Sequence, residues 1–240
     1  MKTSLCTLNI LHFYLKLWFN NVVKTNPINN ISYQGIPIAS YKVCEEKACY
    51  KLYDINHKDK DFLYKMYDAI KLPKLMKNLE EYDYTLWDEM IKNAIRLTNT
   101  AGHKSLLETY NNIPCGIMNY KDVGNKYHLN YVATFPIEVN KRVPCAGQIL
   151  FNELLNRFTQ SDKNRIELSA IRTAPFDPIS TYLKLGFKME GGSEYNEYMG
   201  INKERAARAL LNQENFITKA PIKNKENIDL DKELKLDYIF

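Results

Sequence analysis

Several patterns that indicate a particular chemistry are missing from this chain. The five cysteines form no CxxC pair, no histidine stands beside them at zinc-ligand spacing, and HExxH, GxSxG and GxxxxGK[ST] do not occur. These absences weaken the case for a structural zinc site, a metalloprotease, a serine hydrolase and a P-loop nucleotidase, so we expect no metal. An odd, scattered set of cysteines is typical of reduced thiols, which favours a cytoplasmic protein.

Dense basic runs and long hydrophobic runs are also missing. The 33 Lys and Arg residues are spread along the sequence and the net charge is +5, so there is no strong signal for nucleic-acid binding. The apolar stretch from Ser4 to Phe19 is interrupted by polar residues and is too short to span a membrane. Its leucines recur at helical spacing, which predicts a helix docked on the body of the protein; attachment to a membrane surface is the less favoured alternative.

What is present is the composition of an ordinary globular protein. With 240 residues, 45% hydrophobic and 25% charged, the chain is long enough for one core with extensions. We expect an N-terminal extension at 1–46, formed by the docked helix and an irregular segment around Gly35 and Pro37. The main domain is expected at 47–201, followed by a C-terminal helix and a mobile charged tail at 202–240.

The main domain begins with a pattern of strand, helix and helix. A strand is predicted at 48–55, and amphipathic helices are predicted around 62–70 and 86–95, with apolar stripes that we assign to the core. Asn111-Asn112 then separates two strand patterns and suits positive φ, which predicts a hairpin. The next strand, 127–135, alternates so that one face would carry Tyr127, Leu129, Tyr131, Ala133 and Phe135.

A helix at 147–158, a strand at 166–170, a short helix after Asp177 and Pro178, and two final strands complete the pattern. This order predicts a mixed α/β domain. The loop Arg142-Val143-Pro144-Cys145-Ala146-Gly147 leads from a strand into a helix N-terminus, where unpaired N–H groups and the helix dipole favour phosphate.

This loop and a second motif, from Tyr182 to Phe187, resemble two motifs of the GNAT superfamily of acyl-CoA-dependent N-acetyltransferases. The family's Gln/Arg-x-x-Gly-x-Gly/Ala loop corresponds to Arg142 through Gly147, and its Tyr-x-x-x-Gly-Phe signature corresponds to Tyr182, Gly186 and Phe187. The resemblance implies a GNAT-like α/β (α+β) fold, in which a mixed, mostly antiparallel central sheet is flanked by helices and splays between the fourth and fifth strands. Cys145 departs from the motif glycine, and Pro144 lacks an N–H group.

The resemblance also implies acetyl-CoA as co-substrate, with its pyrophosphate on the loop and its pantetheine arm along the fourth strand. The cofactor-binding residues that it implies are Val132, Ala133, Thr134, Phe135, Arg142, Val143, Cys145, Ala146, Gly147 and Gln148. Tyr182 would protonate the departing thiolate. The strand 127–135 carries no glutamate, which leaves His128 and Glu108 as candidate bases acting through a water.

These residues also have ordinary interpretations: the loop as a surface loop, Tyr182 as a packing aromatic, His128 and Glu108 as structural side chains. The expected function is direct transfer of an acetyl or acyl group to a primary amine on a small molecule, a peptide or an aminoacyl group. The alternative is a catalytically impaired acyl-CoA-binding regulatory domain. Transfer of a long acyl chain near a membrane also remains open, and the sequence does not decide the oligomeric state.

Overall fold

A ten-stranded sheet runs through the part of the chain that the computed structural model describes, which comprises residues 34–44, 49–70, 81–135, 143–172, 177–222 and 226–236. The strands stand in the order β10-β1-β2-β3-β4-β5-β6-β8-β7, and β9 pairs with β1 as well. The β5–β6 pair is parallel and the other described pairs are antiparallel. The expected mixed, mostly antiparallel sheet is therefore confirmed, while the helix predicted at 4–19 lies outside the described residues.

Between residues 50 and 213 the strands and helices follow the predicted order, and further strands precede and follow them. The strands are β1 (Gln34–Val43), β2 (Tyr50–Ile55), β3 (His103–Tyr110), β4 (Ile113–Val123), β5 (Lys126–Thr134), β6 (Arg165–Ile171), β7 (Lys188–Gly192), β8 (Asn196–Asn202), β9 (Ile217–Pro221) and β10 (Ile228–Asp229). The helices are η1 (His57–Asp59), α2 (Lys60–Ile70), α3 (Glu81–Thr98), α4 (Ala146–Gln160), α5 (Pro178–Lys184), α6 (Lys203–Gln213) and α7 (Leu230–Glu233).

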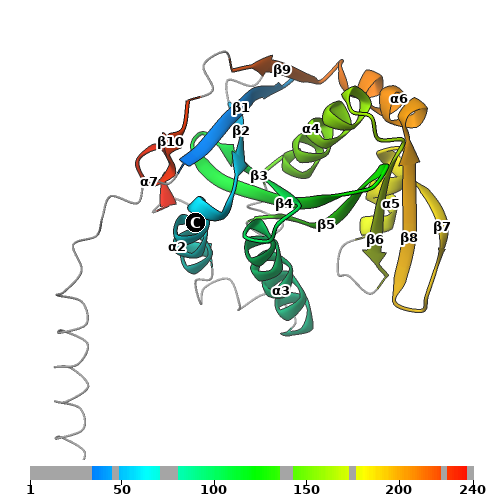
Figure 1. The fold of residues 1–240 in the computed structure, drawn as a ribbon, viewed down its shortest axis with the longest axis horizontal. Helices are drawn as coiled ribbons and strands as arrows, with labels where there is room; N and C mark the ends of the chain where they lie inside the picture. The colour runs from blue at the N-terminus through cyan, green and yellow to red at the C-terminus, as the bar shows by residue number, and fades with distance from the viewer. Residues whose placement is uncertain are drawn as a thin grey trace, which may run out of the picture. The chain divides into compact units, whose positions relative to one another are not determined.

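Helices cover both faces of the sheet, so there are two hydrophobic layers. The apolar stripes of α2 and α3 pack on one face, around Phe62, Met66 and Ile91. The stripe of α4 packs on the other face together with residues of α5 and α6, and Figure 1 shows α4 across the sheet from α2 and α3. Burial of these stripes is the main stabilising term. Of the helices in the described ranges, none is both long and apolar enough to span a membrane.

Local signals in the sequence explain several element boundaries. Asn111 and Asn112 both have positive φ, 52° and 66°, as expected for the turn of the β3–β4 hairpin. The Asp177 side chain accepts a hydrogen bond from the Ser180 N–H at 2.9 Å, and Pro178 occupies the first turn of α5. Both predictions are confirmed.

The segment around Gly35 and Pro37 is the strand β1 rather than an irregular region. Pro37 lies between the stretches of β1 that pair with β10 and with β9, at a shift in the β1–β2 register. Proline is tolerated at such a position, whereas it would break a regular central ladder. Gly35 is needed because a Cβ there would stand 2.5 Å from a Leu230 methyl group.

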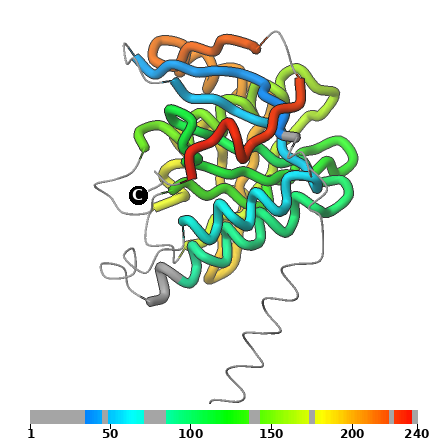
Figure 2. Tube along the Cα trace, turned by 90° about the vertical axis from the view of Figure 1, so that its left-hand side faces the viewer, coloured from blue at the N-terminus to red at the C-terminus, as the bar shows by residue number. Residues whose placement is uncertain are grey.

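The charged C-terminal tail was expected to be mobile, and this expectation is wrong for its described residues. Both β9 and β10 pair with β1, and Figure 2 shows these C-terminal segments beside the N-terminal strand. Leu230 of α7 and Leu234, which follows this helix, are buried against the α2–α3 layer. The sheet thus takes strands from 1–46 and from 202–240, and the three-part division of the chain stays a prediction.

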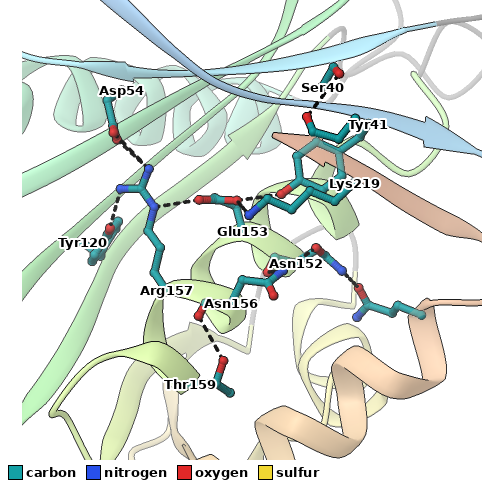
Figure 3. Close-up of polar contacts among 12 residues, drawn as sticks. Ser40, Tyr41, Asp54, Tyr120, Asn152, Glu153, Asn156, Arg157, Thr159 and Lys219 are labelled. Atoms are coloured by element: carbon teal, nitrogen blue, oxygen red, sulfur yellow. Dashed lines mark hydrogen bonds and ion pairs between the residues drawn. The ribbon is translucent and has the colours of Figure 1, made fainter. Parts of the chain in front are cut away.

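A buried polar network ties α4 to the sheet (Figure 3). Glu153 is 5% exposed and accepts hydrogen bonds from the Tyr41 hydroxyl at 2.6 Å, from Lys219 at 2.6 Å and from Arg157 at 2.9 Å. Arg157 also pairs with Asp54 at 2.9 Å. Burial alone would raise the pKa of Glu153, but the hydrogen bonds from these three partners and the charge of Lys219 lower it. The carboxylate therefore stays ionised and joins α4 to β1 and β9.

Candidate active site

The sheet forks between β5 and β6. Their parallel pairing begins at Lys126 and Arg165 and ends at Leu129 and Leu168. Beyond this point β5 continues beside β4 and β6 continues beside β8. The expected splay between the fourth and fifth strands is therefore present, and it exposes one edge of β5.

A β-bulge at Asn130 stands at the fork. Tyr120 pairs with Leu129, but its neighbour Asn119 pairs with Tyr131, so Asn130 is an extra residue in β5. The bulge shifts the alternation by one residue, and the predicted single face of β5 is therefore wrong. Tyr127 and Leu129 pack on the α4 side, whereas Ala133 and Phe135 pack on the α3 side.

A cavity of about 780 Å³ fills the fork and extends to the N-terminus of α4. Its walls are parts of β5, β6, α3, α4 and α5. The lining residues are 128–134, 143, 145–148, 151, 169–171, 178, 181, 182 and 185, with Trp87, Met90 and Asn196.

Most of the predicted site residues meet at this cavity. Those that line it are His128, Val132, Ala133, Thr134, Val143, Cys145, Ala146, Gly147, Gln148 and Tyr182. Phe135 is 1% exposed and belongs to the core on the α3 side, not to the lining. Arg142 lies outside the described residues.

The N-terminus of α4 opens toward the cavity. Cys145 is its N-cap residue and has left-handed backbone angles, φ 58° and ψ 6°. The motif position thus requires backbone angles that glycine adopts easily and that Cys145 adopts as a non-glycine residue. Its side chain makes no capping hydrogen bond, and the Ile149 N–H donates to its carbonyl at 3.0 Å. The N–H groups of residues 146–148 precede that bond and have no acceptor within the helix. Such a terminus attracts anions.

A hydrogen bond from β2 fixes the turn before α4. The hydroxyl of buried Tyr50 donates to the Pro144 carbonyl at 2.7 Å. Pro144 has no N–H group to donate to a ligand. Its carbonyl accepts the hydrogen bond that fixes the turn. Gly147 leaves room on its outer side, because a Cβ there would meet Thr134 at an ordinary contact distance of 3.8 Å.

The exposed edge of β5 provides backbone hydrogen-bonding groups. The Phe135 N–H donates to the Cys115 carbonyl on β4 at 2.9 Å, so by alternation Val132 and Thr134 direct their backbone groups to the open side. Trp87 donates its indole N–H to the Thr134 carbonyl at 3.4 Å. An extended ligand arm in the fork would meet the backbone of Val132.

Tyr182 stands across the fork from this edge. Its ring packs edge-on against Phe151, with centroids 5.5 Å apart, and lies 5.9 Å from Phe187. Burial raises the pKa of Tyr182 to about 12. The phenol therefore remains a hydrogen-bond donor throughout the physiological pH range.

The two candidate bases lie in different environments. His128 lines the cavity, and burial together with the charge of Lys121 lowers its pKa, so its imidazole is neutral near pH 7. Glu108 is fully buried on β3, and burial raises its pKa well above the usual value. A Cβ on Gly116 would stand 3.1 Å from the Glu108 carboxylate and 3.0 Å from Leu150, so Glu108 lies beneath α4 rather than at the cavity.

Sequence reasoning assigned Trp87 and Met90 only to the core stripe of α3, and it singled out neither Ser169 nor Asn196. All four line the cavity, and so does Asn130. The alternation of side chains along β6 places Ser169 on the face opposite Leu168 and Ala170. This alternation identifies Ser169 as a lining residue only when the fork between β5 and β6 is known.

No family model matches the chain, and no curated protein matches it. The PaiA N-acetyltransferase from Thermoplasma acidophilum, in complex with coenzyme A, is a similar solved structure: 19% identity and a TM-score of 0.45 over 64% of this chain and 98% of its own. FdhC, a nucleotide-linked sugar GNAT, has 14% identity and a TM-score of 0.48 over 70% and 94%. A spermidine N-acetyltransferase SpeG chimera from Vibrio cholerae and hSSAT has 15% identity and a TM-score of 0.44 over 66% and 98%.

The topology of this chain is the one that its two motifs predict. A mostly antiparallel sheet carries helices on both faces, and its one parallel pair among the described strands, β5 and β6, opens into a fork. The helix that follows β5 places its N-terminus beside that fork. A mixed, mostly antiparallel sheet with helices on both faces is the arrangement that the resemblance to the GNAT superfamily implies.

Proposed function

We propose that this protein is an acyltransferase that moves an acetyl group from acetyl-CoA to a primary amine by direct attack. The observation that carries the proposal is a cavity that joins a helix N-terminus without intrahelical acceptors, an exposed strand edge and a half-buried tyrosine. These are respectively the groups that a diphosphate, an amide-containing arm and a departing thiolate require.

The donor would lie across the cavity from α4 to the fork. The N–H groups of residues 146–148 would receive the pyrophosphate, and the positive end of the helix dipole would add to the attraction. The backbone of Val132 and Thr134 would pair with the amides of the pantetheine arm. Arg142 remains a predicted phosphate ligand on the strength of the motif alone.

The reaction needs one proton removed and one proton supplied. The amine nitrogen attacks the thioester carbonyl carbon, a C–N bond forms, and the C–S bond breaks. His128, neutral near pH 7, would take the ammonium proton through a water, and Tyr182 would donate its phenolic proton to the departing thiolate and regain one from solvent. The products are an amide and free CoA. Glu108, beneath α4, is the less favoured base.

The experiment is thiol release from acetyl-CoA in the presence of a panel of amines, with calorimetry of acetyl-CoA binding measured in parallel. The proposal predicts binding and amine-dependent thiol release. A protein that binds no acyl-CoA would remove its basis.

A second candidate is a regulatory domain that binds acyl-CoA without turnover. Pro144, the left-handed Cys145 and the lack of a carboxylate on β5 favour it. It predicts CoA binding with no transfer and no effect of Tyr182→Phe, whereas a large rate loss in that variant would exclude it.

A further inference from the structure

The acceptor side of the cavity lies on the sheet face that carries α3. Trp87 and Met90 come from that helix, and Tyr131 packs with its hydrophobic layer. On β6, Leu168 and Ala170 face α4, so Ser169 faces the α3 side. On β5, Tyr127 and Leu129 face α4, so His128 faces the α3 side as well. An amine that attacks from the side opposite α4 would meet these side chains.

This lining carries no fixed charge. Among the described residues that line the cavity there is no Asp, Glu, Lys or Arg. Glu167, which pairs with His128 in the β5–β6 register, lies on the same face and is already paired with Lys126 at 2.5 Å and with Arg165 at 3.2 Å. A polyamine or another polycation keeps positive charges besides the reacting nitrogen, and these would need carboxylate partners on entering a cavity.

The polar groups that do line the acceptor side are neutral. Asn130 stands at the fork, and its side-chain oxygen is buried with no hydrogen-bond partner. Ser169 and Asn196 add a hydroxyl and an amide on the neighbouring strands, and the Tyr131 ring adds an aromatic wall. Hydroxyl groups match neutral amides, and the C–H faces of a sugar ring match an aromatic wall.

The uncharged surroundings also select the amine itself. An uncharged described lining with a neutral imidazole disfavours an ammonium ion, so it favours an amine that loses its proton easily. An amine beside electron-withdrawing oxygens is a weaker base than an alkyl amine, and amino sugars have this chemistry.

We propose that the acceptor is the amino group of an amino sugar, held by Asn130, Ser169 and Asn196, and not a polyamine or a lysine side chain. The inference rests on the proposed transferase function.

The test compares four acceptors with the full chain at saturating acetyl-CoA: glucosamine, a nucleotide-linked amino sugar, spermidine and a lysine-containing peptide. We expect kcat/KM for at least one amino sugar to exceed the values for spermidine and peptide by about tenfold or more, the effect of one unpaired buried charge. The free and nucleotide-linked sugars distinguish the two sources of the same group. KM for glucosamine should change by less than about twofold with added salt, because the described residues on the α3 side of the cavity offer it no ion pair to screen. Preference for spermidine or peptide would overturn the inference.

Variants make the test specific. Asn130→Ala should raise KM for the sugar by about tenfold, and Asn196→Asp should shift the kcat/KM ratio toward spermidine, whereas Asn164→Asp, at an exposed position outside the cavity, should not. Calorimetry with glucosamine alone separates the two proposals. If the protein binds glucosamine in a way that depends on Asn130 but does not bind acetyl-CoA, the transferase function is refuted and the sugar assignment is retained. Acetyl-CoA binding with neither binding nor acetylation of any amino sugar would refute the acceptor assignment.

Discussion

Replacement of Tyr182 by phenylalanine removes one oxygen and leaves the ring in place. The contacts with Phe151 and Phe187, at 5.5 and 5.9 Å between centroids, do not involve the hydroxyl. The packing of α5 on α4 is therefore conserved, and we expect stability and CoA affinity to change little. Whatever turnover is lost in Tyr182→Phe then belongs to the hydroxyl group.

The magnitude follows from the acidity of the phenol. A positioned acid contributes about 10² to 10⁴ in rate. With a pKa of about 12, Tyr182 is a weaker acid than a thiol, so it stabilises the developing thiolate chiefly through a charge-assisted hydrogen bond. We therefore expect the lower end of the range, a loss of about 10² in kcat, or about 2.7 kcal/mol.

The assay is steady-state thiol release with the best acceptor from the panel, with Tyr195→Phe as the control, because that tyrosine is 61% exposed and lies outside the cavity. The control should retain wild-type kcat. If Tyr182→Phe keeps kcat within about twofold of wild type, the phenol contributes nothing of the size expected for an acid and its assignment is refuted.

Four further outcomes are expected. The value of kcat/KM should fall on the acid side of pH 6.5. The pKa of His128 is lowered from 6.5, so its base form is lost only as the pH falls through a pKa below 6.5. His128→Gln should abolish this fall, and an unchanged pH profile would reassign the base. Gly147→Asp should fold normally, since acidic residues suit a helix N-terminus, yet lose about tenfold or more in CoA affinity by calorimetry, and undiminished affinity would contradict the phosphate site. Cys145→Gly should keep CoA affinity and alter the free energy of unfolding by about 1 kcal/mol or less, because relief of the left-handed strain offsets lost packing; a collapse of affinity would show that the side chain itself binds. Glu153→Gln should lower the free energy of unfolding, measured in urea at pH 7, by about 3 kcal/mol, whereas the exposed Glu204→Gln should lower it by about 0.5 kcal/mol or less. Because the pKa of Glu153 is lowered in the folded protein, the stability difference between wild type and Glu153→Gln should shrink as the pH falls through that pKa. A stability difference that does not depend on pH would contradict the network.

Much of the fold could be predicted because its signals are local. Periodicity placed the helices, the Asn111-Asn112 pair placed a hairpin, and Asp177 with Pro178 placed the start of α5. The position of a helix N-terminus after β5 could be predicted, because a strand, a turn and a helix are contiguous in the chain.

What could not be predicted depends on partners distant in sequence. β1 tolerates Pro37 because its outer edge is shared between β9 and β10, which come from the other end of the chain. The bulge at Asn130 is visible only in the register against β4, and it moves every later side chain of β5 to the opposite face. The α3 side of the cavity could not be predicted for the same reason, because Trp87, Ser169 and Asn196 come together only after the sheet has formed.

The most direct measurement is a crystal structure of the protein with coenzyme A. We expect the diphosphate on the N–H groups of residues 146–148, the pantetheine arm against the β5 edge at Val132, and the sulfur beside the Tyr182 hydroxyl. Coenzyme A bound elsewhere, or bound with its sulfur remote from Tyr182, would contradict this expectation.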